Sequence, residues 1–129
     1  MNMQNFPRDV EAEITFLTTE EGGRKTPAFS GYRPQFYVDG QDFVVVHKFF
    51  DGTEPVYPGQ TVKAYLSFTY PEYLVKVLHP GKEFLIREGQ RVIARGSVTK
   101  ILGLEESAKK QEEWMAKRRG AFNAASPRQ

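Results

Sequence analysis

Short segments of alternating hydrophobic residues, separated by glycine and proline turns, constrain the fold of this chain most strongly. In residues 9–17, Val10, Ile14 and Phe16 alternate with charged or polar residues, as expected of a strand with one buried face. Comparable segments occur at 35–38, 43–50, 61–68, 84–86 and 92–98. Six short strands with regular turn signals predict an antiparallel β-barrel or β-sandwich.

The connections between these segments carry recognisable turn residues. Asp39-Gly40, Asp51-Gly52 and Pro58-Gly59 are turn dipeptides, because glycine accepts backbone angles that other residues avoid. Residues 70–81 contain prolines at positions 71 and 80, which predicts a loop with a short helical turn near 73–77.

A change of pattern after Gly103 predicts a helix over residues 104–119. Glu105–Lys109, Glu106–Lys110 and Glu113–Lys117 are pairs that each stabilise a helix by about 0.2–0.5 kcal/mol. The apolar stripe is thin and consists of Leu104, Ala108 and Met115, with Trp114 beside it. We therefore expect a helix that either docks weakly on the β-domain or projects from it.

These patterns divide the chain of 129 residues into four parts. We expect an N-terminal extension at 1–8, a β-barrel domain at 9–103, a charged helix at 104–119 and a disordered tail at 120–129. The chain is long enough for one hydrophobic core. It has no cysteine, no signal-like start and no apolar run near the roughly 20 residues of a membrane span, so we expect a cytoplasmic protein.

Three stretches of the chain resemble the third, C-terminal domain of elongation factor Tu, the GTPase that carries aminoacyl-tRNA to the ribosome. They are residues 20–37 (EEGGRKTPAFSGYRPQFY), 57–63 (YPGQTVK) and 84–102 (FLIREGQRVIARGSVTKIL). The resemblance spans roughly residues 9–102 and implies a six-stranded antiparallel barrel. It also implies a non-enzymatic binding module related to translation, because the GTPase domain of that family has no counterpart in this sequence.

The resemblance implies candidate contacts with the tRNA acceptor and T-stem backbone. They are Arg24, Lys25, Gln35 and Glu88. The alternative is that these are ordinary surface charges, with Arg33 and Arg87 bracing the loops. Residues 40–45 and Tyr70 depart from the family pattern and remove contacts. Residues 1–103 hold 12 basic and 12 acidic residues, without the positive surplus typical of a domain that binds phosphates.

Aromatic residues in loops and on the helix indicate a protein-binding surface. Tyr32, Tyr57, Tyr70, Tyr73 and Trp114 fall in such places, and interfaces favour tyrosine and tryptophan. In the family the barrel packs against the GTPase and second domains, so a separate barrel must cover the packing face. The first hypothesis is therefore a protein-interaction module, centred on Tyr70, Tyr73 and Trp114. Its partner in the translation machinery is a protein that binds the elongation factor, or the factor's own other domains, and an RNA-binding module is the alternative.

The sequence offers little for catalysis or cofactors. Residues 22–26 resemble a phosphate-binding loop only superficially, without its glycine spacing or the helix that follows it. His47 and His79 are the only histidines and no carboxylate motif links them, so a structural or solvated role is expected over a metal or acid–base pair. We expect no enzyme activity, no nucleotide, no cofactor and no metal.

Overall fold

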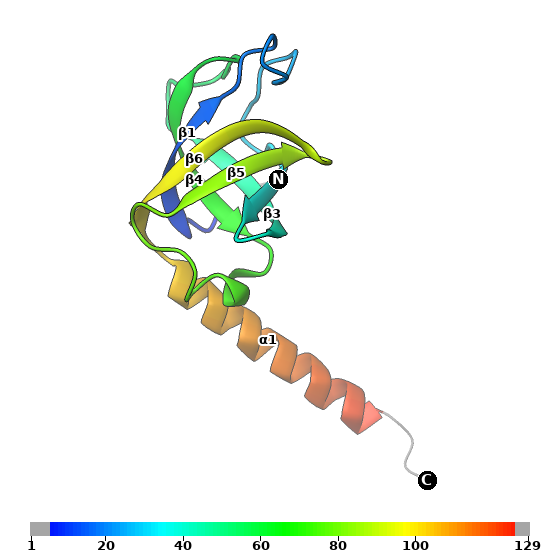
Figure 1. The fold of residues 1–129 in the computed structure, drawn as a ribbon. Coiled ribbons are helices and arrows are strands. Elements are labelled where there is room, and N and C mark those ends of the chain that lie inside the picture. Colours follow the sequence, from blue (N-terminus) through cyan, green and yellow to red (C-terminus); the bar gives the residue numbers. More distant parts are fainter. Residues whose placement is uncertain (1–5, 126–129) are drawn as a thin grey trace.

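The computed structural model describes residues 6–125 and the side chains up to residue 120. Six strands form a closed antiparallel barrel in the order β1–β4–β3–β2–β5–β6, followed by one long helix, α1 (Figure 1). The strands are β1 (Val10–Phe16), β2 (Gln35–Val38), β3 (Gln41–Phe49), β4 (Thr61–Phe68), β5 (Glu83–Glu88) and β6 (Arg91–Ile101). The barrel implied by the resemblance is confirmed.

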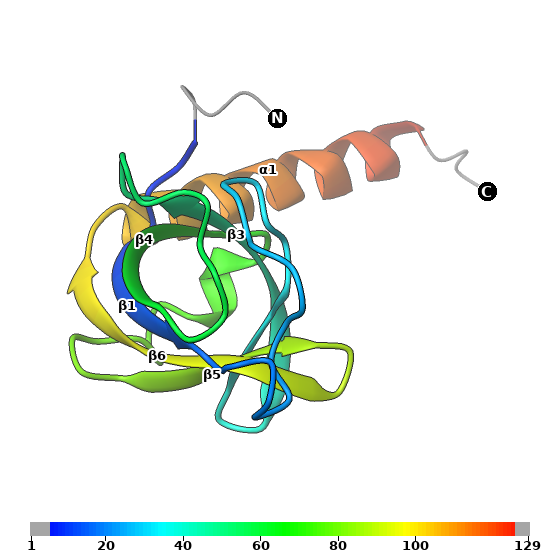
Figure 2. The same ribbon diagram turned by 90° about the horizontal axis from the view of Figure 1, so that it is seen from above.

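The barrel closes because β1 pairs with a strand on each side. Val10 lies opposite Leu66 of β4 and also opposite Ile101 of β6. A closed sheet leaves no unpaired edge along β1. Figure 2, which views the molecule from above, shows the strands encircling one interior.

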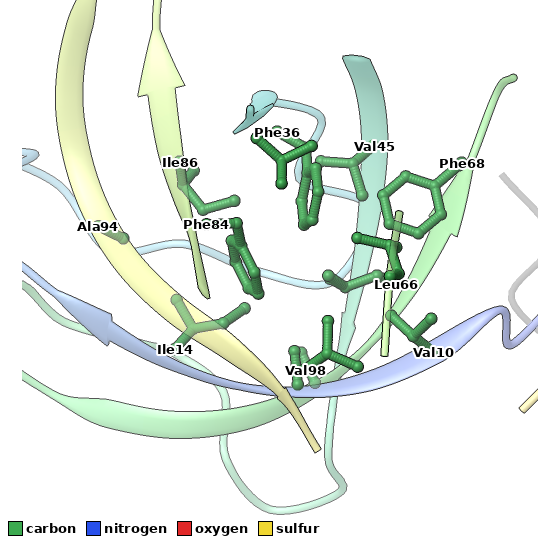
Figure 3. Close-up of a cluster of buried hydrophobic side chains, with 14 of the residues drawn as sticks. Val10, Ile14, Phe36, Val45, Leu66, Phe68, Phe84, Ile86, Ala94 and Val98 are labelled. Carbon is green, nitrogen blue, oxygen red and sulfur yellow. The ribbon is translucent and has the colours of Figure 1, made fainter. Parts of the chain in front are cut away.

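Side chains fill this interior, which is therefore a core and not a channel (Figure 3). Phe36 is fully buried, and its ring stacks on Phe84 with centroids 4.4 Å apart. Phe68 meets Phe36 edge-on at 4.9 Å, the other arrangement that aromatic pairs favour. Gly96 lies opposite Phe84 in the β5–β6 pair, and a Cβ at this glycine would come within 2.7 Å of the Phe84 ring. The small residue thus makes room for the aromatic centre of the core.

Four strands differ from the prediction in their boundaries, and β1 is one residue shorter at each end than the predicted 9–17. β3 begins at Gln41 rather than at residue 43, and β5 and β6 each extend further than the alternating residues indicated. A bulge between β5 and β6 leaves Ile93 without a partner in β5, so Ile93 is fully buried while Val92 is only half-buried. The helical turn after β4 is a 3-10 helix at Pro71–Tyr73, slightly earlier than expected.

Helix α1 spans Leu104–Ala125 and only its beginning packs on the barrel (Figure 1). Leu104 and Ala108 are buried, whereas every side chain from 112 to 120 is exposed. The helix therefore docks through its first two turns and then projects, so both expected arrangements occur in one element.

The helix also continues past residue 119, where the prediction placed a disordered tail. Gly120 interrupts it at a cost of only about 1 kcal/mol relative to alanine. The alanines that follow in the sequence are strong helix formers. Residues 126–129 of the expected tail and 1–5 of the expected extension lie outside the described residues.

Candidate functional site

The antiparallel order of the strands separates the candidate residues into two groups at opposite ends of the barrel (Figure 1). We call one end the loop end; it holds residues 17–34, 50–60 and 89–90. The other is the helix end, formed by residues 69–82 and α1. The candidate RNA contacts lie at the loop end, and the candidate protein contacts lie at the helix end.

A glycine pair folds the first loop back onto the barrel and places Arg24. Gly22 has a φ of +99°, which few other residues tolerate. A Cβ at Gly23 would lie 2.3 Å from the Leu17 carbonyl oxygen, so no larger residue fits there. The next residue, Arg24, then donates from Nε to the Thr26 carbonyl oxygen over 3.2 Å.

Arg24 and Glu88 form an ion pair with each other, and Tyr32 completes the cluster. The Tyr32 hydroxyl donates to Glu88 Oε2 over 2.5 Å, and the Arg24 guanidinium lies 4.6 Å above the Tyr32 ring. Backbone hydrogen bonds of 2.8–2.9 Å tie Gly31 and Tyr32 to His47. The aromatic ring is thereby held between the barrel core and the charged pair.

The ionisation of this cluster follows from its contacts. Burial disfavours the charged form of Glu88, but hydrogen bonds from Tyr32 and Arg24 outweigh it and lower the pKa of Glu88. Burial likewise disfavours the Arg24 cation, and the bond to Glu88 reverses this effect and raises the pKa of Arg24. Burial raises the pKa of the Tyr32 phenol well above its usual value, and its bond to Glu88 adds to the shift. Both members of the ion pair are therefore charged at neutral pH, while Tyr32 stays protonated.

The other two candidate RNA contacts border this cluster. Lys25 is exposed beside Arg24. Gln35 begins β2 and lies in register with Arg87 of β5, the residue before Glu88. The Gln35 side-chain oxygen is buried and has no hydrogen-bond partner among the described residues. The four candidates thus gather at one rim, but only Lys25 presents an exposed charge.

Arg87 lies against the barrel wall, and its Nε also donates to the Gly89 carbonyl oxygen over 3.5 Å, a loop contact of the kind that the alternative interpretation of this arginine expected. Its guanidinium lies 4.4 Å above the Tyr37 ring and 3.5 Å from Asp42 Oδ2. Tyr37 comes from the adjacent strand β2, and Asp42 comes from β3, the next strand beyond β2. Arg33, in contrast, is exposed at the loop end.

A buried carboxylate attaches the helix to the barrel at the other end. Asp9 Oδ2 accepts a hydrogen bond of 2.8 Å from the Phe68 backbone, and Oδ1 accepts one from the Ser107 hydroxyl of α1. Burial raises the pKa of Asp9 above its usual value despite these two bonds. The Gly103 N–H adds a 2.9 Å bond to the Arg8 carbonyl. The start of α1 is therefore fixed by polar contacts as well as by Leu104.

Three exposed aromatic side chains surround this attachment, and we call them the aromatic surface: Tyr70, Tyr73 and Trp114. Their exposed fractions are 47%, 66% and 50%. The two tyrosine rings lie 6.5 Å apart at the two ends of the 3-10 helix. Trp114 borders a groove of about 380 Å³ between α1 and the barrel, which Phe68 and Pro71 also line. The helix end therefore combines exposed rings with a recess beside one of them, Trp114.

The remaining aromatic candidates lie away from this surface. Tyr32 is half-buried in the Glu88 cluster. The prediction instead groups it with the loop aromatics of a protein-binding surface. Tyr57 is exposed, but at the loop end.

The two histidines do not come together. His47 is fully buried between the rings of Tyr32 and Phe49, whose centroids lie 5.4 and 5.7 Å away. Burial lowers the pKa of His47 to about 3, so this histidine is neutral. His79 is exposed in the loop after β4. Within residues 6–125, no group of three or more metal-ligating side chains is assembled.

A comparison with protein-family models decides whether this resemblance reflects family membership. The model described as "Elongation factor Tu C-terminal domain" matches residues 5–102, which span the entire barrel. The chain belongs to the elongation factor Tu C-terminal domain family. The C-terminal domain of elongation factor Tu is a non-catalytic β-barrel, and membership implies a translation-related binding module. Helix α1 begins after the matched region and is therefore an addition to the elongation factor Tu barrel.

Two hydrogen bonds of this family member could not be predicted from its sequence. The Tyr32–Glu88 bond joins residues 56 positions apart, and the Asp9–Ser107 bond joins residues 98 positions apart. Alternation and turn signals report only local structure, so neither pairing has a sequence signal. One further finding concerns the helices: none within residues 6–125 has the length and apolar composition required to cross a membrane.

Proposed function

We propose that this chain is a non-enzymatic protein-interaction module of the translation machinery, with the aromatic surface as its recognition site. The observation that carries the proposal is the exposure of three aromatic side chains at the helix end: Tyr70, Tyr73 and Trp114 are each about half exposed or more. Such rings contribute much of the binding energy at protein interfaces, because they bury a large area with few rotatable bonds.

The construction of the helix end supports this proposal. The Asp9–Ser107 and Asp9–Phe68 bonds fix the angle at which α1 leaves the barrel. Trp114 and the tyrosine pair are therefore presented by rigid elements, which reduces the entropy lost on binding. Of the three rings, Trp114 also borders a groove, so a partner side chain can insert beside it.

Affinity capture with the full chain tests this function. We expect the wild-type chain to enrich proteins of the translation machinery, identified by mass spectrometry, from a lysate of the source cell. The Tyr73→Ala/Trp114→Ala variant should retain less than about a tenth of that enrichment, because two exposed aromatic contacts are lost. Lys25→Ala, at the opposite end, serves as the control and should capture normally. Equal losses in both variants, or no enrichment of translation proteins, would argue against the proposal.

An RNA contact at the loop end is the second candidate function. Its support is the gathering of Arg24, Lys25, Gln35 and Glu88 at one rim. Because Arg24 is engaged with Glu88, Lys25 is the cation most available to a phosphate. A carboxylate in this position fits RNA better than DNA, since it can accept a hydrogen bond from a ribose 2′-hydroxyl.

Titration with tRNA at two salt concentrations tests this second candidate. If phosphates are contacted, the affinity should fall about tenfold between about 50 mM and about 200 mM salt. Lys25→Ala should reduce the dependence on salt, since one phosphate contact is removed. Lys76→Ala removes the same charge at the helix end and should change nothing. Absence of binding at low salt would eliminate the RNA function.

A further inference from the structure

Three cations surround Trp114 on the projecting half of α1. Lys110 precedes the tryptophan by four positions, and Lys117 and Arg118 follow it by three and four. Such spacings bring side chains together on one side of a helix. At 3.6 residues per turn, all three cations lie within about 60° of Trp114 around the helix axis, whereas the glutamates of residues 104–120 lie about 80–180° away. The tryptophan side of α1 is therefore positively charged.

The structure places two of these cations beside the ring and the groove. The Arg118 guanidinium lies 4.8 Å above the Trp114 ring, and Lys110 lines the groove. Lys110 also pairs with Glu106 over 3.2 Å, but the two side chains are 74% and 72% exposed, and ion pairs this exposed contribute little. An acidic group in the groove can therefore compete for Lys110.

The groove beside Trp114 offers an apolar recess next to these charges. Pro7, Phe68 and Pro71 line it together with the tryptophan. Asp9 also lines the groove, but it is only 1% exposed and both of its oxygens are occupied by hydrogen bonds at the helix attachment. The recess can thus accept an apolar side chain, and the cations at its rim can accept carboxylates.

We propose that this surface docks an acidic segment of a protein partner. An apolar side chain of the segment enters the groove beside Trp114, and its carboxylates pair with the three surrounding cations. The inference rests on the proposed function and adds to it the chemical class of the partner. Complementary charge speeds association and excludes partners of the wrong charge, while a buried apolar anchor supplies much of the affinity.

A nucleic acid fits this surface less well than an acidic protein segment. Its phosphates extend along the whole strand, so a protein that holds it needs a continuous positive track. Residues 1–103 contain 12 basic and 12 acidic residues, so the charge around Trp114 does not continue as a surplus over the barrel. An apolar recess also disfavours a charged backbone, because burial removes its hydration.

Fluorescence titration of the full chain tests the proposal, because Trp114 is the only tryptophan and reports directly on the groove. The probes are two synthetic peptides, each with three acidic residues on either side of a central phenylalanine or serine. We expect the phenylalanine peptide to shift the Trp114 emission to shorter wavelength, with a dissociation constant of about 0.1–1 mM that increases at high salt. The serine peptide should bind at least about tenfold more weakly, since its side chain buries little apolar area in the recess.

Charge reversal on the two sides of α1 tests the role of the cations. Lys110→Glu/Lys117→Glu should weaken binding of the phenylalanine peptide about tenfold, because two attractive charges become repulsive. Lys109→Glu/Arg119→Glu makes the same change in net charge about 140° around the helix from Trp114 and should leave the affinity unchanged. Circular dichroism verifies that both variants keep the helix.

The outcomes separate this inference from the function on which it rests. An unchanged Trp114 emission with the phenylalanine peptide at several millimolar overturns the inference, as do equal losses in the two charge-reversed variants. Equal binding of the serine peptide, or of single-stranded polyuridylate, also overturns it, because the surface would then accept anions in general. If the peptides fail but capture from lysate still depends on Tyr73 and Trp114, only the acidic class of partner is wrong and the proposed function stands.

Discussion

Replacing Phe36 with alanine should lower the free energy of unfolding by about 3–5 kcal/mol, the range measured when a buried aromatic ring is deleted. Phe36 is fully buried and contacts the rings of both Phe84 and Phe68. A closed barrel has little freedom to collapse into the space left behind, so a cavity should remain. Urea denaturation of the two proteins measures the difference.

Phe29→Ala is the matched control for this change. Phe29 is 53% exposed at the loop end, so deletion of the same ring there should change stability by no more than about 0.5 kcal/mol. Similar losses for the two variants would contradict the assignment of Phe36 to the centre of the core.

The stability of the barrel should also fall as the pH decreases below neutrality, and His47 should be the cause. The unfolded chain binds a proton at this histidine near pH 6.5, whereas the folded chain does so only near pH 3. Between these values the unfolded state holds more protons, so stability is fully present above pH 6.5 and is lost as the pH falls. The loss due to His47 should reach about 2 kcal/mol at pH 5.

The variant His47→Leu isolates this effect. It removes the titrating group, so its stability relative to the wild type should rise by about 2 kcal/mol between pH 7.5 and pH 5. Asp9, whose pKa burial raises, acts in the opposite direction, but it is present in both proteins and cancels in the comparison. His79→Gln, at an exposed position, should follow the wild type. Parallel curves for His47→Leu and the wild type would show that His47 does not titrate as proposed.

Local patterns in the sequence were sufficient for much of the fold. The alternation in residues 9–17 places Val10, Ile14 and Phe16 on one face, and all three are buried in β1. The glycine pair at 22–23 predicts a turn, and Gly22 adopts the positive φ that such a turn uses. In each case the physical cause acts between neighbouring residues, so it can be identified from the sequence.

Features that depend on distant contacts could not be predicted in this way. The bulge at Ile93 depends on how β6 pairs with β5, whereas strict alternation through residues 92–98 would place Val92 on the same face as the buried Ala94. The docking of α1 depends on Asp9. Nothing in the sequence distinguishes Asp9 from any other charged residue at the start of a strand. Similarly, Arg24 and Glu88 were expected as separate RNA contacts, and their mutual ion pair became evident only from the closed barrel.

Paired capture measures directly whether this family member acts through surface recognition at its helix end. Translation proteins bound by the wild-type chain, Tyr73→Ala/Trp114→Ala and Lys25→Ala would be quantified side by side from one lysate. We predict that the double variant loses at least about nine-tenths of the captured protein while Lys25→Ala loses none. Capture that survives the double variant but disappears with Lys25→Ala would place recognition at the loop end instead of at the aromatic surface.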